Sequence, residues 1–327
     1  MQLGSNLDAA TNRPVKLRMR PDLIASPRLV GRQIRYVIKD PIALEHHQLW
    51  EEEFALLKML DGHTSFAEIK TQFEARFRPS RLDFSRLEVL LGRFHRSGLV
   101  LADRPGQGEQ LFKRREHARA GQLWHRFRNL LAIRFRGVNP DRLLTSWCKR
   151  LGWCFSTSCL SCLLLFILIT FAFVALQWRV WFPRLEELQA YLTPINLIWL
   201  AIAFSGLKVI HELGHGLACK YYGGECNEMG VMLLAFAPCL YCDVSDSWII
   251  ESKWRRAFVA AAGIWFEMLA AAICAWLWWF SQPGLIHSIC FSAMMVGGLG
   301  TLFFNANPLL RYDGYFVLSD ILESPNL

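Results

Sequence analysis

The sequence predicts a polytopic α-helical membrane protein with about four spans, preceded by a small α+β domain. The 327 residues are 53% apolar and include 13 Trp and 23 Phe, which is too apolar for one soluble domain. Most of the charge lies in residues 1–150, so the chain is not embedded in a membrane throughout. From Ser156 onward, apolar runs of about 20 residues are long enough to cross the hydrocarbon core.

The N-terminal part is expected to begin with a mobile leader, because residues 1–33 are polar and show no periodicity. Residues 34–103 then have the spacing of a strand, three helices and a wing. The expected elements are a strand at Ile34–Ile38, helices at Leu49–Leu60, from Ser65 onward and at Asp83–Ser97, and a closing strand at Gly98–Leu101. Ser65 followed by Glu68 is typical of a capped helix start.

This order, with Leu56-Leu57, Leu60-Asp61-Gly62 and Ser97–Val100, resembles the PqqD-like winged-helix domains, which bind leader peptides of ribosomally made peptides. The resemblance implies that residues 34–103 dock a leader peptide. Winged helices also bind DNA, but this helix bank is not strongly basic and a membrane anchor makes chromosome binding awkward, so we predict no nucleic-acid partner. A purely structural cap is the alternative.

The segment 104–155 is predicted to be a basic amphipathic stretch on the membrane surface. Lys113–Arg150 contains eleven Lys or Arg against only Glu116 and Asp141, a net charge of +9 that exceeds the +8 of the whole chain. Interleaved Leu, Trp and Phe side chains favour an anionic lipid leaflet as its partner. Nucleic-acid binding is the rival interpretation, but the adjacent span favours the membrane surface.

Four spans are expected within the membrane domain, residues 156–327. We place them near 156–178, 194–218, 257–280 and 285–305. Between the second and third, Met229–Pro238 is apolar but too short to cross, and we expect a re-entrant β-hairpin there. Non-helical backbone at membrane depth is tolerated only against protein or a wet cavity, so the hairpin should line the functional site and could pair with an extended peptide.

The Lys and Arg distribution predicts the orientation, because positive residues favour the cytoplasmic side. Met1–Arg20 has no apolar core, so we expect no signal peptide and a cytoplasmic N-terminus. The basic cluster Lys253–Arg256 falls on the same side. The prediction is a multi-pass protein of a bacterial inner (cell) membrane.

The motif His211-Glu212-Leu213-Gly214-His215, inside the second span, indicates metal-activated hydrolysis. Residues i and i+4 share one face of a helix, so His211 and His215 can hold one metal ion. Glu212 is placed to take a proton from a water molecule that the metal activates. Ionisable groups in a span cost about 2.5–3.5 kcal/mol each on insertion scales and need partners, which a metal ion would supply.

A catalytic zinc takes a third protein ligand and keeps one open position. Asp313, just after the last span, is the best candidate. The chain here resembles the site-2 protease family of intramembrane zinc metallopeptidases (peptidase family M50), whose pattern is HExxH on one span and Asn-x-x-Pro-x4-Asp-Gly at the end of a later one. Asn305, Pro308, Asp313 and Gly314 match the second motif at its spacing. No span follows Asp313, so we expect a minimal or truncated relative.

The resemblance implies a zinc-dependent endopeptidase that cleaves membrane-embedded or membrane-proximal peptides or membrane proteins. One catalytic Zn²⁺ would be held by His211, His215 and Asp313. Glu212 would act as general base and then as proton donor, and Asn305 would orient the substrate or its oxyanion. The alternative is a non-catalytic membrane component that binds or escorts a peptide in export or maturation, for which an intact Glu212 is not needed.

Three further features leave alternatives open. Glu267 lies where site-2 proteases usually carry Gly-Pro-x-x-Asn, and it could face substrate, form a hydrogen bond or pair with Lys208. Cys239-x-x-Cys242 has no second pair at zinc-finger spacing, so we expect a structural or redox-silent role. His46-His47 are neighbours that do not face the same way, and we interpret them as surface residues.

Overall fold

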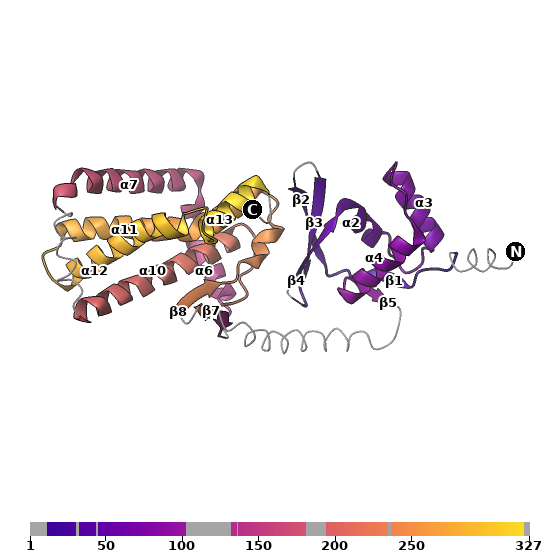
Figure 1. The fold of residues 1–327 in the computed structure, drawn as a ribbon, viewed down its shortest axis with the longest axis horizontal. Coiled ribbons are helices and arrows are strands. Elements are labelled where there is room, and N and C mark those ends of the chain that lie inside the picture. Colours follow the sequence, from indigo (N-terminus) through magenta and orange to yellow (C-terminus); the bar gives the residue numbers. More distant parts are fainter. Residues whose placement is uncertain are drawn as a thin grey trace. The chain divides into compact units, whose positions relative to one another are not determined.

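The computed structural model describes residues 12–30, 33–43, 45–102, 132–135, 137–180, 194–234 and 237–323. The chain divides into two compact units, residues 1–129 and 130–327. Figure 1 shows that the N-terminal unit mixes strands and helices, whereas long helices dominate the C-terminal unit.

The N-terminal unit contains two small antiparallel sheets and three helices. Its strands are β1 (Leu17–Met19), β2 (Ile24–Val30), β3 (Gln33–Asp40), β4 (Glu45–Trp50) and β5 (Val100–Ala102), and its helices are α2 (Glu51–Lys58), α3 (Phe66–Arg76) and α4 (Phe84–Arg96). The sheets have the orders β2-β3-β4 and β1-β5. One apolar core joins them to the helices and includes Ile38, Leu57, Ile69, Leu87 and Phe94. The predicted strand, three helices and closing strand are therefore present.

Two details of this unit differ from the prediction. The expected mobile leader is wrong for its second half, because β1 and β2 form within it and Val15 is buried in the core. Pro27 hides β2 in the sequence, but β2 is an edge strand of its sheet, where a residue without an N–H group is tolerated. The helix expected at Leu49–Leu60 is α2 and begins at Glu51, because Leu49 belongs to the preceding strand β4.

A helix cap and a buried ion pair stabilise the N-terminal unit. The Ser65 side chain accepts from the Glu68 N–H while Glu68 accepts from the Ser65 N–H, which is the predicted capping box of α3. The buried Arg20 guanidinium donates to both oxygens of Asp40 at 2.7 and 2.8 Å. Burial alone would raise the pKa of Asp40, but the bonds from Arg20 hold it below its ordinary value, so this pair stays charged.

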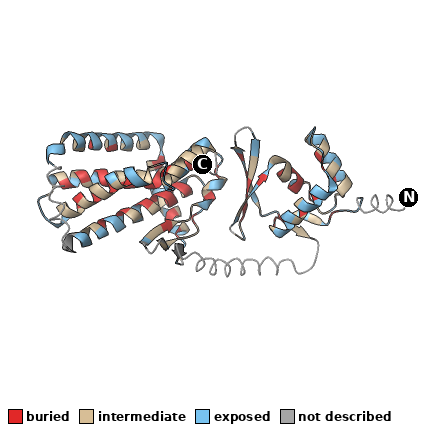
Figure 2. Cartoon of the chain, in the orientation of Figure 1, coloured by how far each residue is buried: buried red, intermediate tan, exposed pale blue. Residues whose placement is uncertain are grey.

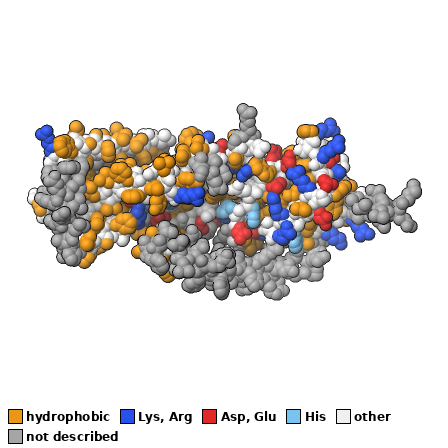
Figure 3. Space-filling view, in the orientation of Figure 1, with side chains coloured by type: hydrophobic (Ala, Val, Ile, Leu, Met, Phe, Trp, Pro, Cys, Tyr) orange, Lys and Arg blue, Asp and Glu red, His pale blue; other side chains and the backbone are white. Residues whose placement is uncertain are grey.

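The C-terminal unit contains the four predicted membrane spans. They are α7 (Thr157–Leu176), α10 (Pro194–Tyr221), α11 (Lys253–Phe280), and α12 (Leu285–Met295) continued by a π-helix, η3 (Val296–Asn305). All four are long and apolar enough to cross a membrane. Hydrophobic side chains make up much of the visible face of this bundle (Figure 3). Burial is concentrated on α10, α11 and α12, whereas α7 is mostly exposed along its length (Figure 2).

Smaller elements gather at one end of the bundle (Figure 1). They are β6 (Ala132–Arg134), α6 (Asp141–Leu151), a short 3-10 helix (Gly152–Phe155), the hairpin of β7 (Met229–Leu234) and β8 (Ala237–Cys242), a 3-10 turn (Ser245–Ile249) and α13 (Asp313–Leu322). The hairpin expected between the second and third spans is thus present. It carries an additional strand, because β6 pairs antiparallel with β7 in the order β6-β7-β8.

The predicted basic surface segment has only a partial counterpart in the structure. Residues 104–131 lie outside the described residues. Farther along, β6 joins the hairpin sheet, and α6 packs against α10 with Leu144 fully buried. The Lys220 ammonium, on α10, binds both oxygens of Asp141 at 2.8 and 2.9 Å. The described residues between 132 and 155 therefore pack against the rest of the membrane unit, and the membrane-surface placement of residues 104–155 stays a prediction.

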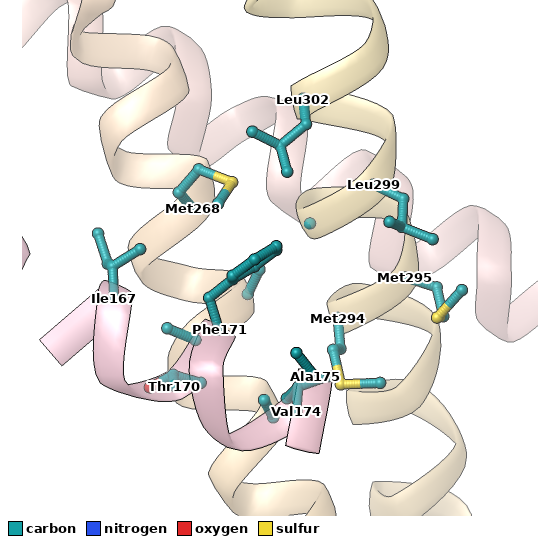
Figure 4. Close-up of a pocket in the computed structure, with 14 residues that line it drawn as sticks. Ile167, Thr170, Phe171, Val174, Ala175, Met268, Met294, Met295, Leu299 and Leu302 are labelled. Atoms are coloured by element: carbon teal, nitrogen blue, oxygen red, sulfur yellow. The ribbon is translucent and has the colours of Figure 1, made fainter. Parts of the chain in front are cut away.

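An apolar cavity of about 210 Å³ lies between α7, α11 and the α12–η3 helix (Figure 4). Phe171, Met268, Met294 and Leu302 are among the side chains that line it. None of its lining residues is an acid, a base or a metal ligand. This cavity is therefore not the place where chemistry is expected.

Candidate metal centre

The two histidines of the HExxH motif lie one turn apart on α10, and their rings are close together. Both side chains are buried, and their ring centroids are 4.8 Å apart. The Nε2 atoms of His211 and His215 are separated by 3.2 Å. The i, i+4 spacing therefore brings the two nitrogens to a common point, as predicted for residues on one helix face.

Hydrogen bonds at the other ring nitrogens orient both imidazoles. His215 Nδ1 lies 2.8 Å from the carbonyl oxygen of Val259, which can only accept, so Nδ1 carries the proton. His211 Nδ1 lies 2.8 Å from Glu267 Oε2. In a neutral imidazole with a protonated Nδ1, Nε2 has a free lone pair. Both lone pairs consequently point toward the shared position between the rings.

Asp313, which follows the last span, adds a third donor. Its Oδ2 atom is 2.9 Å from His211 Nε2 and 3.5 Å from His215 Nε2. This oxygen is buried and receives no hydrogen bond from the described residues. As a carboxylate, Asp313 offers this oxygen as an acceptor or a metal ligand.

Contacts between α11 and α13 hold Asp313 in this place, at the first residue of α13. Arg256 is almost fully buried, and its Nε donates to Asp320 at 3.2 Å. Its Nη1 also donates to the carbonyl oxygens of Ile250 and Glu251. The link from Arg256 fixes α13 to α11, and with it the approach of Asp313 to the histidines.

The three ligand atoms are better suited to binding a metal ion than to direct contact with one another. With neutral imidazoles, two nitrogen lone pairs and a carboxylate oxygen converge at this point, an arrangement that is repulsive without a cation. Within the described residues, His211, His215 and Asp313 form the one group of ligand atoms close enough to share a metal. Tetrahedral zinc with ligands at roughly 2.0–2.1 Å requires donor separations of about 3.3 Å, close to those found here. Imidazole nitrogens with a carboxylate are also a donor set that zinc accepts.

Glycine is required where α11 crosses α10 beside this centre. A Cβ atom at Gly263 would lie within 2.5 Å of His211 Nε2 and closer still to His215 Nε2. A Cβ atom at Gly214 would lie 2.9 Å from the Ala262 carbonyl oxygen. The two glycines allow the helices to approach closely and leave the space beside the donor atoms open.

The structure places Glu212 next to the centre but not in the donor group. Glu212 is half-buried, and its carboxylate receives no hydrogen bond from the described residues. Such a group can accept a proton from a nearby water molecule, which is the role predicted for it. Asn305, at the end of η3, donates from Nδ2 to Glu267 Oε2 at 3.0 Å, a contact that its motif did not indicate.

Glu267 contacts three other residues. It binds Lys208 as the sequence allowed, with Nζ at 3.1 and 3.2 Å from its two oxygens, and it also binds His211 and Asn305. Its side chain is almost fully buried. The sequence left the role of Glu267 open, because neither its position in a span nor its place in the family pattern indicated which residues it would contact.

The CxxC pair does not form a site of its own. Cys239 and Cys242 both lie on β8, and Cys242 Sγ is 3.2 Å from Cys226 Sγ in the preceding loop. All ten cysteines are free. His46 and His47 both lie on β4 of the N-terminal unit, whereas the candidate metal ligands belong to the C-terminal unit.

An HExxH helix places two histidines and a glutamate as zinc metallopeptidases do. Here this helix lies in a four-span bundle, and a carboxylate after the last span completes the group. Comparison with protein families supports this class. Residues 199–292 match the model of Peptidase family M50. The match includes the HExxH motif and confirms the predicted resemblance to family M50. Asn305 and Asp313 of the second motif lie beyond the matched residues, and their placement rests on the geometry described above.

One curated protein is similar to part of the chain. It is named "Putative peptide zinc metalloprotease protein YydH", from Bacillus subtilis (strain 168), and is 25% identical over 170 residues. The aligned part covers 48% of this chain and 63% of that protein, so less than two thirds of the relative's length is matched. No solved structure matches the chain.

Proposed function

We propose that this protein is a zinc-dependent intramembrane endopeptidase of the site-2 protease type. One observation carries the proposal: ligand atoms of His211, His215 and Asp313 converge beside the carboxylate of Glu212, with both histidines inside a span. A binding protein would need neither the convergence nor the base. The zinc metalloprotease name of the Bacillus subtilis relative supports the choice of metal.

Each residue of the centre has a role in peptide hydrolysis. A bound zinc ion polarises a carbonyl group and lowers the pKa of water. Glu212 then takes the proton of the attacking water and delivers it to the leaving amine. One N–H of the Asn305 side-chain amide donates to Glu267. The second N–H of this amide is available to orient the substrate carbonyl.

The proposed substrate is a membrane-embedded or membrane-proximal peptide in an extended conformation. A helix in lipid hides its carbonyl groups in its own hydrogen bonds, so it must open locally before cleavage. Within the described sheet, β8 pairs only with β7 and presents its other edge. We propose that the hairpin is re-entrant and that an extended substrate segment pairs with this edge.

We further propose that the N-terminal unit lies in the cytoplasm and docks a leader peptide. Its strand, helices and wing support a winged-helix order, and the PqqD-like resemblance stays a prediction. The basic residues before the first span support a cytoplasmic N-terminus in a bacterial inner membrane, with membrane lipid as the partner of that segment.

Thiol labelling in intact cells tests the orientation. Cys239 should react with a membrane-impermeant reagent only after permeabilisation, because the loop that carries it faces the cytoplasm in this topology. A Gln282→Cys variant, between α11 and α12, should gain labelling from outside. Labelling of Cys239 from outside would show the opposite orientation.

Metal analysis combined with a cleavage assay tests the function itself. The detergent-purified protein should contain one zinc ion per chain and cleave membrane peptides in liposomes, with products identified by mass spectrometry. Asp313→Ala and His211→Ala should each lose stoichiometric zinc and cleavage together. Full zinc occupancy in His211→Ala would refute the site, and a zinc-loaded wild type that cleaves no peptide in a broad set would favour the escort alternative.

A further inference from the structure

Glu267 connects the two halves of the candidate metal centre. Its Oε2 atom accepts from His211 Nδ1 on α10 at 2.8 Å and from Asn305 Nδ2 at the end of η3 at 3.0 Å. His211 belongs to the first motif and Asn305 to the second. One oxygen atom on α11 thus contacts both motifs at the same time.

Lys208 neutralises this carboxylate. The ammonium lies 3.1 and 3.2 Å from the two oxygens of Glu267, and it sits one turn before His211 on the same helix. An unpaired carboxylate at this depth would be costly, whereas the pair carries no net charge. The ion pair therefore allows a full carboxylate to remain beside His211, where a neutral side chain would accept a hydrogen bond less strongly.

We propose that Glu267 is a positioning residue of the metal centre, which holds His211 by its Nδ1 and ties it to Asn305. The inference rests on the proposed zinc site, and it assigns to this chain a carboxylate at the place where the related pattern usually has Gly-Pro-x-x-Asn. A carboxylate that accepts the second ring N–H of a metal-binding histidine fixes the ring and its tautomer and raises its basicity. Glu267 does so for His211, as the Val259 carbonyl does for His215.

The contact with Asn305 extends the effect of Glu267 to the third ligand. Asn305 is the last residue of η3. Asp313, the first residue of α13, follows after a short connection. Holding Asn305 on Glu267 fixes the start of that connection, while Arg256 and Asp320 fix α13 beyond it. Loss of the accepting oxygen at Glu267 should therefore loosen both His211 and the approach of Asp313.

Two double variants separate this role from simple charge balance. Lys208→Met/Glu267→Gln and Lys208→Met/Glu267→Met are both neutral at the pair and have side chains of similar length, so neither leaves a buried unpaired charge. They differ in one respect, because Gln keeps a carbonyl oxygen that can accept from His211 and Asn305. The measurement is zinc affinity of the purified protein by competition with a chelator, which does not depend on catalysis.

The Gln variant should bind zinc within a few-fold of the wild type, whereas the Met variant should bind about 10–100-fold more weakly, the usual effect of removing such a partner. Equal affinity of the Met and Gln variants would overturn the proposal, because charge balance alone would then explain Glu267. Wild-type protein without zinc would instead refute the proposed function, and the inference with it. Thermal unfolding of all three proteins checks that the variants remain folded.

Discussion

Replacing Glu212 with Gln is expected to abolish detectable peptide cleavage while leaving the zinc content unchanged. Gln has nearly the same shape as Glu but cannot take up the proton of the attacking water. General-base groups typically contribute about 10²–10⁴-fold to a rate. Glu212 is not in the donor group of His211, His215 and Asp313, so the metal should remain bound. Product formation in liposomes, followed by mass spectrometry, measures the effect.

The same variant distinguishes the two functions under consideration. A peptide escort needs no general base, so its Glu212→Gln form would support peptide export or maturation as well as the wild type does. Asp313→Ala provides the comparison, because it should lose zinc and cleavage together. Cleavage by Glu212→Gln at the wild-type rate would remove the base role from this residue.

Much of the fold could be predicted from local sequence patterns. The four spans follow from apolar runs of sufficient length, and the structure places them within a few residues of the prediction. The capping box at Ser65 and Glu68 depends on residues three apart and was equally visible. By contrast, β2 depends on pairing with β3, and its Pro27 conceals the strand pattern until its position at the sheet edge is known.

The candidate site shows the same division between local and distant information. His211 and His215 are one helical turn apart, so their spacing alone indicates a shared ligand face. Asp313 could be predicted only because its motif resembles that of a family. The contact of Glu267 with His211 and Asn305 joins residues 56 and 38 positions apart in the chain, and no local pattern encodes it.

The close helix crossing at Gly263 was also not visible in the sequence, and it leads to a sharp test. Gly263→Ala is expected to abolish zinc binding at a zinc concentration that saturates the wild type. The added Cβ would overlap both Nε2 atoms, so the imidazoles must move or the metal position is filled. Moving the rings would break their Nδ1 contacts with Glu267 and Val259. Elemental mass spectrometry of the purified protein measures the loss of zinc.

Gly206→Ala on α10 is the matched control, because a Cβ there has no atom within 4 Å. Alanine favours a helix over glycine by roughly 1 kcal/mol, so both variants should retain their helices. Circular dichroism should therefore be unchanged in both, while zinc is lost only from Gly263→Ala. Full zinc occupancy in Gly263→Ala would show that the metal does not bind between the two Nε2 atoms. Loss of zinc from both variants would instead mean that small changes anywhere in the bundle disturb the centre, and the steric explanation would fail.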